Sequence, residues 1–149
     1  MVKEILLGDN PFLGVSHLAH EKARAEQGET RDLEAKARVL IAGLEGGVTG
    51  YTFSTHQVNL ELLGYMSKNY PDALTKLNYY MLIPHAQGYV RRANVYGTVG
   101  LAKSVLRDIV LKHPADFATS ILTLNANRLA SLFIGMEAKP YSKILSEEN

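Results

Sequence analysis

The sequence predicts an α/β protein built from parallel βα units. Three short apolar runs alternate with longer segments in which apolar residues recur at helical spacing. Each run is followed by residues that form turns or begin helices, which is typical of strands in βα units. Strands that alternate with helices are joined by right-handed crossovers, and these connections favour a parallel sheet.

The three apolar runs define the predicted strands. The first covers residues 3–7 and stops at a Gly-Asp-Asn-Pro sequence, residues 8–11, which is a strong turn signal. The second covers residues 48–53. The third covers residues 77–83, is almost wholly apolar and ends before Pro84. Continuous hydrophobicity of this kind predicts a strand that is buried on both faces in a parallel sheet.

About four helices complete the predicted pattern. Thr30 suits the N-cap of the first helix, which should end at Gly46-Gly47. The hydroxyl of Ser54 or Thr55 can cap the second helix. The ranges expected after the third strand are a polar loop at 86–93, helices at about 94–113 and 115–138, and a polar tail at 142–149.

Composition limits the class of protein and its partners. A length of 149 residues suits one domain, so residues 1–149 are expected to form a single domain. The net charge of +1 gives no electrostatic basis for binding nucleic acid. The absence of cysteine excludes disulfides, thiolate metal sites and cysteine nucleophiles. No signal-peptide or membrane-spanning run is found, so we expect a cytoplasmic protein without a membrane partner.

Three strands are too few for a closed barrel. A complete (β/α)₈ barrel needs ~250 residues, so the chain is expected to be a partial, TIM-barrel-like segment. A small open α/β sandwich is the alternative architecture. An exposed parallel edge favours association, so a barrel-like segment is expected to be either truncated or completed by another chain, which is a second copy in a homo-oligomer or a different partner.

Three segments also carry a resemblance to known families. At residues 7–12, 51–56 and 82–85 the chain resembles the front of TIM-barrel proteins, most of all an uncharacterised prokaryotic group with a similar Gly-Asp-Asn-Pro-Phe strand end and a following His. This resemblance covers nearly the whole chain and implies an N-terminal barrel portion that lacks the later strands. The chain also resembles aldo-keto reductases, whose second strand leads into Asp-Thr-Ala. Residues 54–56 read Ser-Thr-His here, so the catalytic aspartate of that family has no counterpart.

The predicted strand ends carry the candidate catalytic residues. Ligands of parallel α/β sheets bind beyond the carboxyl ends of the strands. Asp9 follows the first strand, His56 the second and His85 the third, while His17 lies in the long segment after the first strand. Histidine titrates near neutral pH and binds metals through a neutral nitrogen, so this cluster suits acid/base chemistry or a divalent metal ion. The alternative for Asp9 is a hydrogen bond within its own turn.

Four further residues are candidates for binding a substrate. Asn10 and Thr55 adjoin the predicted catalytic residues. Arg91 and Arg92 lie in the predicted loop after the third strand, before a helix N-terminus, where guanidinium groups suit a phosphate or a carboxylate. The alternative is a solvated pair of loop arginines.

Two functions therefore remain open. The first is an enzyme that acts on a small polar or anionic metabolite through the His/Asp cluster. The second is a non-catalytic half-barrel that folds by self-association or with a partner chain. The sequence identifies neither the substrate nor the cofactor.

Overall fold

The computed structural model describes residues 4–13, 32–83 and 86–146. The chain divides into two compact units. The sheet unit comprises Met1–Leu82 and Pro140–Asn149, and the helical unit comprises Ile83–Lys139. The single domain expected from the length of the chain stays a prediction.

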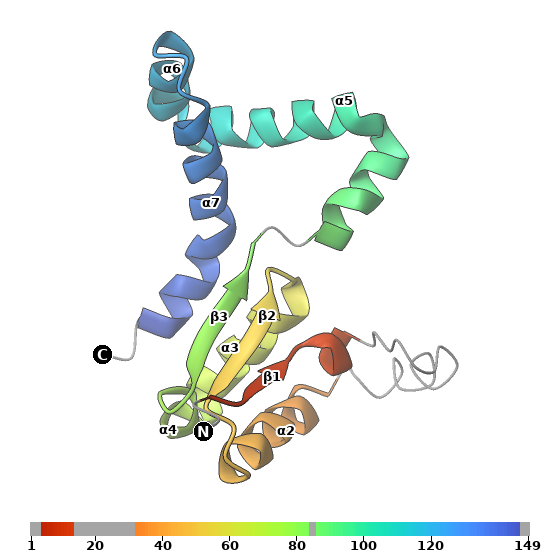
Figure 1. The fold of residues 1–149 in the computed structure, drawn as a ribbon, viewed down its shortest axis with the longest axis vertical. Helices are drawn as coiled ribbons and strands as arrows, with labels where there is room; N and C mark the ends of the chain where they lie inside the picture. Colours follow the sequence, from red (N-terminus) through yellow and green to blue (C-terminus); the bar gives the residue numbers. More distant parts are fainter. Residues whose placement is uncertain (1–3, 14–31, 84–85, 147–149) are drawn as a thin grey trace. The chain divides into compact units, whose positions relative to one another are not determined.

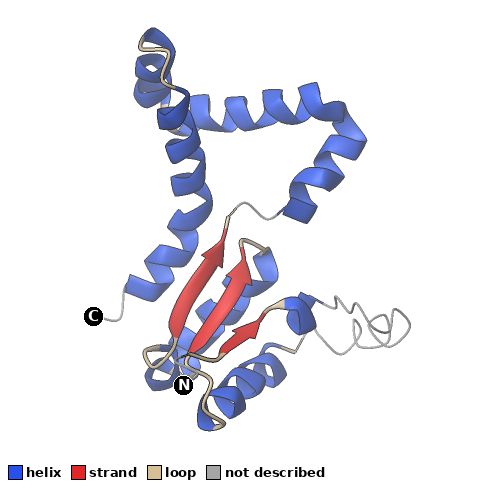
Figure 2. Cartoon of the chain, in the orientation of Figure 1, coloured by secondary structure: helices blue, strands red, loops and turns tan. Residues whose placement is uncertain are grey.

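The sheet unit contains a three-stranded parallel sheet (Figure 2). Its strands are β1 (Leu6–Gly8), β2 (Gly50–Ser54) and β3 (Asn78–Leu82), in the order β1-β2-β3. Leu7 is in register with Tyr51 of β2, and Tyr51 is in register with Tyr79 of β3. The predicted α/β class and the parallel sheet are confirmed, and the sheet is open rather than closed into a barrel.

The helices that connect these strands lie on one face of the sheet (Figure 1). α2 (Leu33–Glu45) packs against α3 (Gln57–Asn69), and the short α4 (Pro71–Leu74) follows α3. Right-handed crossovers between strands in sequential order place successive helices on the same side, as in a barrel. The side chains fully buried in the core of this unit include Ala37, Leu40, Tyr51, Phe53, Leu62, Leu63 and Met66.

Within the sheet unit, no described element covers the opposite face of the sheet. Its apolar side chains Leu6, Tyr80 and Leu82 are 46%, 41% and 56% exposed. A Cβ atom at Gly50 would lie 2.6 Å from the Leu6 side chain and 3.0 Å from the Tyr80 ring, so both side chains lean over this glycine. The prediction that the third strand is buried on both faces was wrong: alternate residues of β3 are exposed, because within the sheet unit helices cover only one face.

The first crossover helix ends where the sequence predicts but is capped by a different residue. The Asp32 carboxylate accepts hydrogen bonds from two backbone N–H groups of the first turn of α2, at 2.9 and 3.3 Å. Thr30, the predicted cap, lies outside the described residues. Gly46 is the C-cap, and Gly47 follows with φ +94°, a left-handed conformation that glycine adopts without strain.

The helical unit is more helical than the sequence predicts. α5 (Ala86–Lys112) includes residues 86–93, so the loop predicted there was wrong. The break in α5 falls at Gly97, where φ is +70°. The helix predicted at 115–138 is divided into α6 (Pro114–Leu122) and α7 (Ala126–Ser146), and the turn between them includes Leu124 with φ +50°. The described residues therefore form six α-helices, not about four.

The last turns of α7 belong to the core of the sheet unit. Pro140 lies inside the helix, and the segment predicted to be a polar tail is helical as far as Ser146. Tyr141 is 4% exposed, and its ring centroid lies 5.5 Å from that of Phe53. The prediction of a polar tail was wrong for residues 142–146, because Ile144 and Leu145 pack against the core together with Tyr141. Residues 147–149 lie outside the described residues.

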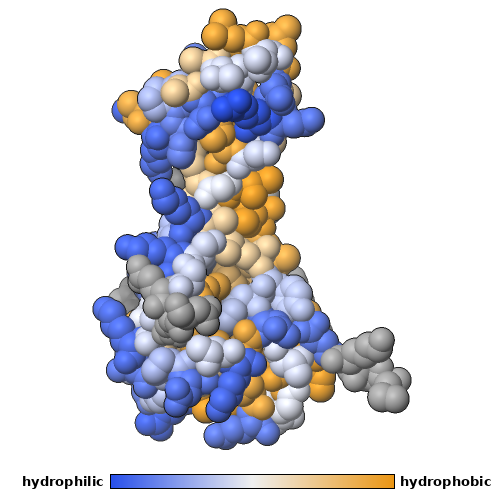
Figure 3. All heavy atoms as spheres, turned by 90° about the vertical axis from the view of Figure 1, so that its left-hand side faces the viewer, coloured by the Kyte–Doolittle hydropathy of each residue, from blue (hydrophilic) through white to orange (hydrophobic). Residues whose placement is uncertain are grey.

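The helical unit buries little of its apolar surface. Ile109 and Ser120 are the buried residues among those described in this unit. Leu122 and Leu124, at the turn between α6 and α7, are 85% and 90% exposed. Figure 3 shows hydrophobic side chains gathered at the surface over these helices. Within the described ranges, no helix has the length and apolar character needed to span a membrane.

Candidate functional site

The carboxyl end of the sheet is organised around a buried carboxylate. Asp9 directly follows β1 and is 6% exposed. Its backbone carbonyl accepts hydrogen bonds from the N–H groups of Phe12 and Leu13, at 2.9 and 3.1 Å. These bonds form the single 3₁₀ turn η1 (Asn10–Leu13). The Gly-Asp-Asn-Pro turn thus directs the Asp9 side chain back toward the neighbouring strand.

One oxygen of Asp9 joins three elements. Oδ2 accepts hydrogen bonds from the backbone N–H of Ser54 at 2.8 Å, from the Ser54 hydroxyl at 2.7 Å and from the Asn59 amide at 2.8 Å. Ser54 ends β2 and Asn59 lies in the first turn of α3, so the carboxylate ties β1 to both. Hydrogen bonds to an ionised carboxylate are short and strong, as these are.

Asn59 extends this network into the core. Its side chain is fully buried, and its amide also donates to the Ser54 carbonyl at 2.9 Å. Its Oδ1 accepts a hydrogen bond from the Tyr51 hydroxyl at 2.9 Å. Burial raises the pKa of Tyr51, since the phenolate form would be desolvated, and the Asp9 charge adds to this effect. Tyr51 therefore stays a neutral donor, and the network has a fixed direction.

The second oxygen of Asp9 differs from the first. No described residue donates a hydrogen bond to Oδ1. A carboxylate has acceptor capacity on both oxygens, so Oδ1 can still bind a donor. The alternative considered from the sequence is that Asp9 forms a hydrogen bond within its own turn. The backbone carbonyl of Asp9 does so, but its side chain bonds to Ser54 and Asn59 instead.

His56 is held at the start of α3. Its ring Nδ1 accepts a hydrogen bond from the Val58 N–H at 3.2 Å, so His56 is the N-cap rather than Ser54 or Thr55. The Ser54 hydroxyl is not available as a cap because it donates to Asp9. The His56 carbonyl accepts a hydrogen bond from the Tyr141 hydroxyl at 2.9 Å. With Nδ1 as an acceptor, the neutral ring carries its proton on Nε2.

The other predicted site residues are placed as follows. Asn10 is exposed on η1, and Thr55 is half-buried between β2 and α3. Arg91 and Arg92 belong to α5 of the helical unit rather than to a loop. His17 and His85 lie outside the described residues, so the predicted His/Asp cluster stays a prediction. Among the residues the structure describes, no group of three His, Asp or Glu side chains could hold a metal ion.

The sequence did not single out Ser54 and Asn59 as partners of Asp9. Ser54 could have been identified from the sequence as a candidate site residue, because it is the first polar residue after an apolar strand. Asn59 lies five residues further on, among apolar positions of a helix, and only the fold brings it to Asp9. Comparison with known proteins adds no further assignment, since no family model, curated protein or solved structure matches this chain.

Proposed function

We propose that the protein is an enzyme that binds a small polar metabolite at the carboxyl end of its sheet, with Asp9 Oδ1 accepting a hydrogen bond from a hydroxyl or ammonium group. The observation that carries the proposal is the asymmetry of the Asp9 carboxylate. Three donors hold Oδ2, while Oδ1 has no donor among the described residues. Preorganised groups of this kind bind and orient substrates without being reordered.

The position of Asp9 supports the same proposal. In open and barrel-like parallel sheets, ligands bind beyond the carboxyl ends of the strands. A side chain whose only role is to connect strands need not be ionisable. Burying a carboxylate also costs free energy unless hydrogen bonds compensate for the lost hydration. His56 and His85, which follow the second and third strands in the sequence, are proposed to supply acid/base groups or, with Asp9, ligands for a divalent cation.

The test compares two carboxylate-to-amide variants. Asp9→Asn keeps an oxygen that can accept from Ser54 and Asn59 but removes the charge, whereas Asp72→Asn removes an exposed charge on α4. Melting temperature is measured against a panel of small polyols, amino alcohols and hydroxy acids, with and without Zn²⁺ or Mg²⁺. We expect one class of these compounds to raise the melting temperature of both the wild type and Asp72→Asn. Asp9→Asn should lose at least about tenfold in affinity, as expected when a charged hydrogen bond is lost.

Asp9→Ala is the companion variant for folding. It leaves the Ser54 and Asn59 donors without their acceptor, so the free energy of unfolding should fall by about 2–3 kcal/mol. Equal ligand affinity in Asp9→Asn and the wild type would contradict the proposal, as would a panel in which no compound stabilises the wild type. If Asp9→Ala is destabilised but Asp9→Asn binds every ligand as the wild type does, Asp9 has only a structural role, and this result also contradicts the proposal.

A second candidate function is assembly with another copy of this chain. The observation in its favour is the uncovered sheet face, where Leu6, Tyr80 and Leu82 are partly exposed and no charged strand residue occurs. This face carries one described carboxylate, Glu4, which accepts hydrogen bonds from Asn78 and Tyr80, and its apolar side chains can pack against those of a second copy. Sedimentation should then show a concentration-dependent dimer, and Leu82→Lys should shift it to monomer. A wild-type monomer at all concentrations would rule out this candidate.

A further inference from the structure

The turn between α6 and α7 exposes an uncharged apolar tip on the helical unit. We define the tip as residues 121–125, which read Ile-Leu-Thr-Leu-Asn. Ile121, Leu122 and Leu124 are 51%, 85% and 90% exposed. Residues 117–127 contain no charged side chain. Exposed apolar residues that gather in one place are typical of a surface that binds a partner.

The backbone of the tip is strained at one of these leucines. Leu124 has φ +50°, a left-handed conformation that is unfavourable for a residue with a Cβ atom. Its side chain gains almost no contact in return, because it is nearly fully exposed. Strained backbone is concentrated at sites where a function other than folding maintains it. The stability of the fold therefore does not explain why a leucine occupies this position.

The hydrogen-bond donors of the tip are already paired within the helical unit. The backbone N–H groups of Thr123, Leu124 and Asn125 donate to carbonyls of α6 at 3.0, 3.1 and 2.9 Å. The Thr123 hydroxyl donates to the Thr119 carbonyl at 2.7 Å, and the Asn125 side-chain oxygen accepts from the Arg128 N–H at 3.0 Å. Donors paired in this way can enter an apolar medium without losing bonds to water.

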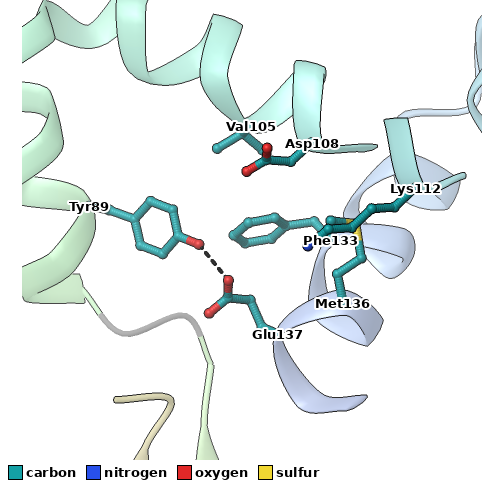
Figure 4. A pocket seen from close by; sticks show the side chains of 7 residues that line it. All are labelled: Tyr89, Val105, Asp108, Lys112, Phe133, Met136 and Glu137. Carbon is teal, nitrogen blue, oxygen red and sulfur yellow. Dashed lines mark hydrogen bonds between the residues drawn. The ribbon is translucent and has the colours of Figure 1, made fainter. Parts of the chain in front are cut away.

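Contacts among the three helices hold the tip in place. Arg128 of α7 donates to the Asp116 carboxylate of α6 at 2.7 Å, which joins the helices on either side of the turn. Figure 4 shows where α5 meets α7: the Tyr89 hydroxyl donates to Glu137 at 2.9 Å, and the Tyr89 ring lies edge to face against Phe133. The tip thus belongs to a folded unit and loses little conformational freedom when it binds.

The charge of the helical unit favours one kind of partner. Residues 83–139 contain seven Lys and Arg residues and three Asp and Glu residues, a net charge of +4, whereas the whole chain carries +1. Lys103 and Arg107 on α5 are exposed and form no ion pair with a described residue. A unit with this charge repels the same unit of a second copy and is attracted to an anionic surface.

We propose that the tip inserts into the surface of a bilayer that contains anionic lipids. Its apolar side chains enter the boundary between the headgroups and the acyl chains, and the net positive charge of the unit attracts the anionic headgroups. The sequence-based expectation of no membrane partner depended on the absence of a spanning run, and insertion of a turn requires none. A bilayer also needs no complementary groove, which a protein partner would have to supply.

The experiment measures cosedimentation of the full-length chain with two kinds of vesicle, phosphatidylcholine alone and phosphatidylcholine with about 30% phosphatidylserine. We expect binding to the anionic vesicles to be at least about tenfold stronger than to the neutral ones at low salt, and to weaken as salt is added. The double variant Leu122→Ser/Leu124→Ser should bind the anionic vesicles at least about tenfold more weakly, because it loses two buried leucines. Lys103→Gln/Arg107→Gln should weaken the same binding several-fold.

Control variants separate the tip from exposed apolar residues in general. Leu82→Ser removes an exposed leucine from the sheet unit and should leave vesicle binding unchanged. The circular dichroism spectra of the tip variants should match the wild type, because the replaced side chains are exposed. Equal binding of the wild type to both kinds of vesicle would overturn the proposal, as would wild-type affinity in the double tip variant. Self-association that the double tip variant abolishes, without vesicle binding, would assign the tip to a second copy and overturn it too.

Discussion

The two units of this chain use similar apolar residues in very different ways. In the sheet unit, helix residues such as Leu40 and Leu62 are buried against aromatic side chains of the strands. In the helical unit, Leu122 and Leu124 are almost fully exposed. A helix buries its apolar stripe only where a second layer is present to receive it. The sheet supplies that layer in one unit, and no described element supplies it in the other.

The largest expected effect comes from the core of the sheet unit. Phe53 is fully buried, its ring stacks on Tyr51 at 5.2 Å, and it also contacts Tyr79 and Tyr141. Phe53→Ala should lower the free energy of unfolding by about 3–5 kcal/mol, because it leaves a cavity among these rings. Urea denaturation followed by far-UV circular dichroism measures this loss.

The matched variant lies in the helical unit. Leu122→Ala removes a side chain that is 85% exposed, so the same measurement should change by less than about 0.5 kcal/mol. A loss for Leu122→Ala comparable to that for Phe53→Ala would show that the helical unit buries this surface in solution, and the contrast between the two units would disappear.

A smaller effect is expected from relieving backbone strain in the helical unit. Leu124 has φ +50°, a left-handed conformation that is unfavourable for a leucine, and its side chain is 90% exposed. Leu124→Gly should stabilise the turn between α6 and α7 by about 0.5–1 kcal/mol, after allowing for the greater freedom of glycine in the unfolded chain. Amide hydrogen exchange in α6 and α7 should slow, and Leu124→Ala, which keeps the Cβ atom, should not reproduce the gain.

The smallest effect concerns acid stability of the sheet unit. Glu34 accepts hydrogen bonds from the hydroxyls of Tyr65 and Tyr70 and pairs with Arg38 at 2.7 Å. The Arg38 and tyrosine hydrogen bonds lower the pKa of Glu34 from 4.5 to about 2. A depressed carboxyl pKa adds stability above the unfolded value, and this contribution disappears as the pH falls from 4.5 towards 2.

Glu34→Gln should therefore lower the melting temperature at pH 6 and flatten its decline between pH 5 and 2. Tyr70→Phe removes one donor and should produce a weaker change in the same direction. Parallel melting curves for wild type and Glu34→Gln over this pH range would show that the Glu34 interactions contribute nothing in solution.

The sequence predicted most of the sheet unit because its signals are local. Apolar runs bounded by turn residues located all three strands, and Gly46 marked the end of α2. The same local reasoning failed for residues 86–93, whose polar composition suggests a loop although the backbone is helical. It also failed at Tyr141, since the contact with Phe53 joins residues far apart in the chain.

The sequence by itself determined that a carboxylate follows the first strand and a histidine the second. Strand ends are local features, and parallel pairing brings them to one edge of the sheet. Only the tertiary structure decided what these groups do there. Asp9 meets Ser54 and Asn59, which lie 45 and 50 residues away, and His56 turns to cap α3. Hydrogen bonds between distant residues depend on the register of the strands and the placement of the helix, and neither is encoded in a short motif.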